Sequence, residues 1–81
     1  MNNFLKVIID VIRDKFDVST ELTGDTNLSD TGLDSLDIIN LLFSIEERTG
    51  VQIPDAVIVE ENIKTLGQLS EFVERQKGTA G

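Results

Sequence analysis

The sequence predicts an all-α fold, a small four-helix bundle with one short third helix and a long loop between helices one and two. Three observations predict this fold. Apolar residues recur at helical spacing in three segments, and residues that cap or end helices flank two of these segments. The 81 residues also suffice for one domain only. On folding, such a short chain buries about 60% of the surface that the unfolded chain exposes, so its core is small.

The first helix is expected over residues 3–16, followed by a long loop. Its apolar positions at helical spacing are Leu5, Ile8, Ile9, Ile12 and Phe16. Residues 17–34 are rich in Ser, Thr, Asp, Asn and Gly and show no sustained period. A loop of that length in a compact domain has to be functional or packed internally. The residues expected to pin it to the core are Leu22, Leu28 and Leu33.

A second helix is expected from Ser35 to Thr49, with Asp34 as its N-cap and Gly50 as its terminator. Its apolar residues span roughly 220° of the circumference, whereas a helix packed on one side needs little more than 100°. One interpretation is that this helix is central and touches every other helix. The other is that some residues stay partly exposed as a docking stripe, and both can hold at once. The stripe would consist of Leu36, Ile39 and Phe43.

The sequence after residue 50 predicts a single helical turn and a last helix. Residues 51–55 are expected to be extended because Pro54 pushes Ile53 out of helical geometry. A single helical turn is expected at Glu60–Ile63. A capping-box pattern at residues 65–68 then opens the last helix, which is expected to end at about Gln76. Its inward residues are Leu66, Leu69, Phe72 and Val73.

The domain is expected to cover residues 1–77, with residues 78–81 as a disordered tail of small residues. The core of that domain is expected to come from both long helices and the last one. Its residues are Ile8, Ile12, Phe16, Leu41, Ile45, Ile63, Leu69 and Phe72.

The composition excludes most catalytic chemistry. The chain has no cysteine and therefore no disulfide, thiolate metal site or thiol nucleophile. It also has no histidine, on which most acid–base and nucleophilic mechanisms depend. We expect no enzyme, no catalytic residue and no metal site. The N-terminus shows no signal-peptide pattern, and no apolar run approaches the roughly 18 residues of a membrane span. We therefore expect a soluble, cytoplasmic monomer.

The net charge of −8 is concentrated in the middle of the chain. Residues 21–63 hold ten of the fifteen acidic residues and a single basic residue, Arg48, so this segment carries −9 and the rest carries +1. Such a charge excludes nucleic acid as a partner. The acidic segment can be a solvated face that aids solubility, or a docking surface for proteins with basic patches.

Ser35 stands where the loop meets the second helix, directly after Asp34. A hydroxyl at a helix start can be a plain cap, or the attachment point for a group that the protein carries. A phosphodiester on this oxygen would be stabilised by the unpaired N–H groups and the positive dipole of the first turn. Because Asp34 is available as the cap, the Ser35 hydroxyl would be free for modification.

Four segments of the chain together resemble the acyl carrier protein family. They read Gly-Leu-Asp-Ser-Leu-Asp at 32–37, Glu-Glu-Arg-Thr-Gly at 46–50, Ile-Pro-Asp at 53–55 and Ile-Lys-Thr-Leu at 63–66. The resemblance implies that a phosphopantetheinyl transferase moves a 4′-phosphopantetheine arm from coenzyme A to Ser35. Asp34 would be the adjacent motif residue. The thiol of the arm would hold acyl cargo as a thioester, which suits a carrier that lacks cysteine.

The resemblance also implies a recognition surface for acyl-loading and acyl-processing enzymes, synthases and transferases, that have basic docking patches. Its residues would be Leu36, Asp37, Ile39, Phe43, Glu46, Glu47, Glu60 and Glu61. Members from fatty acid biosynthesis usually have glutamate at the position of Asn40 and a segment about two residues shorter than 56–62. These departures favour a free-standing carrier in polyketide or another specialised biosynthesis.

Two alternatives stay open. One is an aminoacyl or peptidyl carrier, although typical peptidyl carriers have Gly-Gly where this chain has Gly32 and Leu33. The other is an acidic helical interaction module without a prosthetic group, in which Ser35 is only structural.

Overall fold

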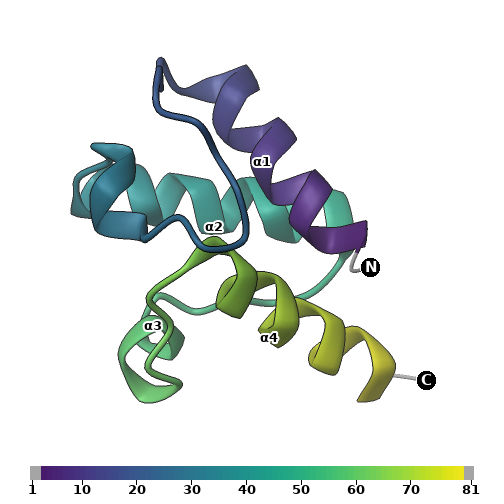
Figure 1. Ribbon diagram of the computed structural model, residues 1–81. Helices are drawn as coiled ribbons and strands as arrows, with labels where there is room; N and C mark the ends of the chain where they lie inside the picture. Colours follow the sequence, from purple (N-terminus) through teal and green to yellow (C-terminus); the bar gives the residue numbers. More distant parts are fainter. Residues whose placement is uncertain (1–2, 80–81) are drawn as a thin grey trace.

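The computed structural model describes residues 3–79, which form an all-α bundle (Figure 1). Its elements are α1 (Asn3–Lys15), the 3-10 helix η1 (Leu28–Thr31), α2 (Ser35–Thr49), the short α3 (Ala56–Glu60) and α4 (Leu66–Thr79). The most extensive contacts between helices join α1 to α4 and α1 to α2, so α1 rather than α2 is the central helix. The predicted fold class, with its short third helix, is confirmed. Within the described residues, no helix is long and apolar enough to cross a membrane.

The core draws apolar residues from α1, α2, α4 and the connections between them. Its buried members are Ile8, Val11, Ile12, Leu22, Leu28, Leu41, Leu42, Ile45, Val51, Ile53, Ile63, Leu66, Leu69, Phe72 and Val73. Seven of the eight predicted core residues are among them. Phe16 is the exception, because it follows the last residue of α1 and packs only partly buried against the edge of the core.

Both ends of α2 and the start of α4 form as the sequence predicts. Asp34 accepts a hydrogen bond from the Asp37 N–H at 2.8 Å, and the Asp37 carboxylate accepts one from the Asp34 N–H at 3.5 Å. Thr65 and Gln68 form the same reciprocal box at the start of α4, with distances of 3.1 and 3.0 Å. Gly50 ends α2 with a φ of 77°, a left-handed conformation that glycine adopts easily.

The long loop before α2 is bound to the start of α4 (Figure 1). Leu28 donates its N–H to the Lys64 carbonyl at 2.8 Å, and the Gly67 N–H donates to the Gly24 carbonyl at 2.8 Å. Leu22 and Leu28 are buried as expected, whereas Leu33 is half-buried against the core. The loop therefore has a fixed path, which fixes the start of α2.

The predicted position of the third helical piece is wrong. The helix α3 spans Ala56–Glu60, so it ends where the turn at Glu60–Ile63 was expected. Asn62 ends it with a φ of 53°, and the Ile63 N–H donates to the Ile58 carbonyl at 2.9 Å. This is a Schellman ending with asparagine in place of glycine. Five residues are too few to show a helical period, so the apolar pattern could not place the helix.

The last helix is longer than predicted, because α4 continues past Gln76 to Thr79. Gly78 is helical rather than part of a tail, and open space surrounds it. The rest of the expected tail, residues 80–81, lies outside the described residues.

Candidate functional site

Ser35 is the first residue of α2, and its side chain is exposed. Its hydroxyl forms no hydrogen bond with any of residues 3–79. Asp34 takes the capping role, since its carboxylate binds the Asp37 N–H and its carbonyl accepts from the Ile38 N–H at 3.0 Å. The helix start is thus satisfied without Ser35, and the hydroxyl remains available.

The backbone before Ser35 is held by a buried threonine. Thr31 donates its hydroxyl to the Leu28 carbonyl at 2.6 Å and accepts from the Leu33 N–H at 3.3 Å. Gly32, between them in the chain, has a φ of 83°, which residues with a Cβ rarely adopt. These contacts turn the chain sharply out of η1 and fix the approach to α2.

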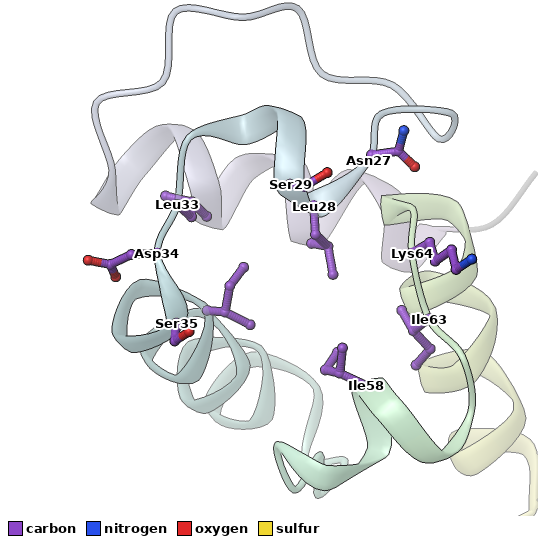
Figure 2. Close-up of a pocket in the computed structure, with 10 residues that line it drawn as sticks. Asn27, Leu28, Ser29, Leu33, Asp34, Ser35, Ile58, Ile63 and Lys64 are labelled. Atoms are coloured by element: carbon purple, nitrogen blue, oxygen red, sulfur yellow. The ribbon is translucent and has the colours of Figure 1, made fainter.

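A pocket of about 510 Å³ lies beside Ser35, between α2, α3, η1 and the segment that leads into α4. Its lining residues are Asn27, Leu28, Ser29, Leu33, Asp34, Ser35, Ile38, Ile58, Ile63 and Lys64. In Figure 2, Leu28, Ile58 and Ile63 point into the same central space, with Ser35 at its edge. Asp34 points away from that space, and the Lys64 ammonium group points outward. The pocket therefore has apolar walls and a polar rim.

This arrangement fits a group joined to Ser35 through a phosphodiester. The hydroxyl is exposed, and it lies at the positive end of a 15-residue helix, where an anion is stabilised. The apolar walls beside it can shelter an apolar portion of the same group. Asp34 and Asp37 direct their carboxylates to each other's backbone N–H, which leaves Ser35 unobstructed by either hydrogen bond.

The predicted docking stripe is only partly exposed. Leu36 and Phe43 are 66% and 58% exposed, whereas Ile39 is half-buried. This exposure confirms that α2 has more apolar surface than the core covers. Of the acidic residues beside this stripe, Asp37 is half-buried and Glu47 is exposed.

The other predicted docking carboxylates are engaged within the fold or lie on another helix. Glu46 is half-buried, and its Oε2 accepts from the Ile53 N–H at 2.6 Å. Glu60 and Glu61 lie at the end of α3, and Glu61 pairs with Arg75 of α4 at 3.5 Å. The eight predicted residues therefore do not behave as one uniform acidic face.

Among the apolar residues of the pocket, the sequence analysis gave no role to Ile38 or Ile58, and it expected Ile63 only in the core. Ile58 could have been found from Asn62, because an asparagine three residues after an apolar run is a candidate left-handed helix end. Val59 was missed as well, and it is 82% exposed.

Comparison with known proteins gives consistent similarities. Residues 6–73 match the family model described as a phosphopantetheine attachment site. An acyl carrier protein of Amoebophilus asiaticus is 37% identical to this chain over 78 residues. The matched residues cover 94% of this chain and 95% of that relative. An acyl carrier protein of Porphyromonas gingivalis is 35% identical over 77 residues, with coverages of 93% and 96%.

Solved structures show the same similarity. One is the crystal structure of Bradyrhizobium japonicum glycine:[carrier protein] ligase complexed with its cognate carrier protein and an analogue of glycyl adenylate. The match has 26% identity and a TM-score of 0.67, and it covers 93% of this chain and 96% of the other. A second structure holds the same ligase with glycylated carrier protein. That match has 25% identity and a TM-score of 0.62, and it covers 86% of this chain and 93% of the other.

Proposed function

The chain belongs to the acyl carrier proteins, a family with a phosphopantetheine attachment site, and on this premise we propose that Ser35 bears the arm. The protein is a carrier rather than an enzyme, and its prosthetic group is 4′-phosphopantetheine. That group supplies a terminal thiol, which holds acyl cargo as a thioester. The residues of the chain position the arm, shelter its cargo and present both to enzymes.

The single observation that carries this assignment is the free hydroxyl at the start of α2. Ser35 is exposed and lacks a hydrogen bond to any of residues 3–79, because Asp34 caps the helix. A transferase can therefore reach this oxygen without unfolding the helix start. The phosphodiester anion would then gain about 0.3–1 kcal/mol from the first-turn N–H groups and the helix dipole.

Two surfaces serve the carried group in this proposal. The apolar side chains of Leu28, Ile58 and Ile63 shelter an acyl chain beside Ser35. The exposed side chains of Leu36 and Phe43 meet the enzymes that load and process the cargo. Because the segment around them is strongly acidic, basic patches on those enzymes would be steered towards this face.

The test is modification of the apo protein by coenzyme A and a promiscuous phosphopantetheinyl transferase. The intact mass should rise by one phosphopantetheine, and Ser35→Ala should abolish the rise while helicity by circular dichroism is unchanged. Ser29→Ala is the matched control, since Ser29 is an exposed serine of the same pocket, and it should be modified like the wild type. A wild type that stays unmodified while a reference carrier is loaded would favour the interaction module instead.

We assign the pathway to polyketide or other specialised biosynthesis, with fatty-acid-like biosynthesis as a related case. The support is Asn40 in place of an acid on α2 and the long apolar segment around α3. An aminoacyl carrier is the second candidate, favoured by the similarity to the carrier that binds a glycine ligase. The intact mass of natively purified protein separates these, because an aminoacyl group and an acyl chain add different masses to the arm.

A further inference from the structure

The pocket beside Ser35 has different chemistry at its two edges. In Figure 2, Ser35 lies at one edge of the central space and Lys64 at the other. Leu28, Ile58 and Ile63 point into the space between them. Leu28 and Ile63 are 8% and 5% exposed, so they belong to the core as well as to the pocket wall. The pocket therefore runs from a hydroxyl group, across an apolar stretch, to an ammonium group.

The backbone of Lys64 is fixed, whereas its side chain is unpaired. The Lys64 carbonyl accepts from the Leu28 N–H at 2.8 Å, and the Lys64 N–H donates to the Gln68 Oε1 at 2.7 Å. The ammonium group forms no hydrogen bond or ion pair with any of residues 3–79. It points outward at the edge of the pocket (Figure 2), and the residue is exposed. The cation is therefore held at one place and is available to a group outside the fold.

This available cation stands alone in its part of the chain. Lys64 is the only basic residue between Arg48 and Arg75. Both of those arginines pair with a carboxylate of the fold at 3.5 Å. Among the lining residues of the pocket, the one acid is Asp34, which lies next to Ser35 at the other edge. The Lys64 edge of the pocket is thus positive in a strongly acidic surrounding.

We propose that the preferred cargo of this carrier is an acyl chain that ends in a carboxylate, and that Lys64 pairs with this carboxylate. The inference rests on the proposed attachment of the arm at Ser35. Cargo on that arm enters the pocket from the Ser35 edge, and its methylene groups lie on the apolar walls. Its far end emerges at the opposite edge, where the carboxylate stays in water beside the ammonium group.

The two edges together define the class of cargo. A carboxylate within the apolar stretch would lose its hydration without a partner, so several methylene groups have to separate it from the thioester. At the far edge it gains charge-assisted hydrogen bonds from Lys64, which a methyl end cannot form. The acidic segment repels a carboxylate elsewhere on this face. The cargo is therefore the half-thioester of a dicarboxylic acid with a methylene chain.

Two matched cargoes of equal chain length test the proposal. A promiscuous phosphopantetheinyl transferase loads the apo protein from hexanoyl-coenzyme A or from adipoyl-coenzyme A, and the intact mass verifies each product. The methyl resonances of Ile58 and Ile63 then report the fraction of cargo that lies in the pocket. The adipoyl group should shift the resonances of the Lys64 ε-methylene group, whereas the hexanoyl group should leave them in place.

Lys64→Gln removes the charge from a side chain that makes no hydrogen bond within residues 3–79, so the fold should persist. The variant should lower the ratio of sheltered to free adipoyl cargo about threefold, as expected for an exposed ion pair. Hexanoyl cargo should be unaffected. Lys15→Gln is the matched control, because it removes the same charge from an exposed lysine outside this pocket, and it should affect neither cargo.

Three results on loaded protein would overturn this inference and leave the proposed function intact. They are equal effects of Lys64→Gln on the two cargoes, an effect of Lys15→Gln as large as that of Lys64→Gln, and Lys64 resonances that do not respond to the adipoyl group. Protein that is never loaded at Ser35 would overturn the proposed function, and this inference with it. The intact mass distinguishes the two cases before any resonance is recorded.

Discussion

The long loop before α2 and the segment around α3 both connect longer helices, but the fold holds them in opposite ways. The loop buries Leu22 and Leu28, and three backbone hydrogen bonds fix it to the start of α4. The segment with α3 is helical, yet it buries no residue of that helix and leaves Val59 82% exposed. Regular secondary structure and secure attachment are therefore separate properties here.

The proposed function gives this difference a reason. The loop carries the chain to Ser35, and an attachment point at Ser35 would have to lie in one place relative to α2. The helix α3 forms a wall of the pocket beside Ser35, and a wall of a cargo pocket would have to give way when cargo enters or leaves. Regions that move in function come from parts of a fold with few buried contacts, and α3 buries none of its residues.

The largest expected effect is the difference in stability between a variant of the loop and a variant of α3. Leu22→Ala removes a buried loop side chain and should lower the free energy of unfolding by about 2–5 kcal/mol. Val59→Ala removes an exposed side chain from α3 and should change it by less than about 0.5 kcal/mol. Urea denaturation of both variants measures the contrast. Similar losses in the two would mean that α3 is as firmly packed as the loop.

The contact between Gly24 and Gly67 is the next place to probe the loop. A Cβ on Gly67 would lie 2.8 Å from the Gly24 carbonyl oxygen, a backbone atom that cannot rotate away. Gly67→Ala should therefore destabilise the protein by about 1–3 kcal/mol, although alanine favours helices. Gly78→Ala in the same helix is the control, because open space surrounds it. That variant should be neutral or stabilised by up to about 1 kcal/mol in thermal denaturation.

Asn62 should show a smaller and more local effect at the end of α3. Its φ of 53° disfavours residues with an ordinary side chain, so Asn62→Ala should cost about 1 kcal/mol. Asn62→Gly should stay within about 0.5 kcal/mol of the wild type, because glycine accepts this conformation but adds entropy to the unfolded chain. Hydrogen exchange should place the loss at Ile63, whose N–H closes the turn. A loss spread evenly over α1 and α4 would contradict a weakly coupled α3.

The same contrast explains what the sequence could predict. The capping boxes of α2 and α4 rest on side chains close in sequence to the backbone groups that they bind, such as Asp34 with Asp37. Local chemistry of this kind is visible in the residue order, as is the motif around Ser35. The wall formed by Ile58 depends on where α3 lies, and the Glu46–Ile53 bond depends on how the chain returns to α2. Neither contact produces a periodic pattern in the sequence, so neither could be predicted without the structure.

The smallest expected effect comes from the charge of the acidic segment. Residues 21–63 carry −9 and include both connections between α2 and its neighbours, so their mutual repulsion opposes folding. Moderate salt screens charges beyond about 10 Å and should raise the melting temperature by about 2–6 °C, which corresponds to roughly 0.5–1 kcal/mol. The firmly bound loop should respond less than α3 in exchange experiments with and without salt. A melting temperature that is flat or falls from low to moderate salt would show that other interactions outweigh this repulsion.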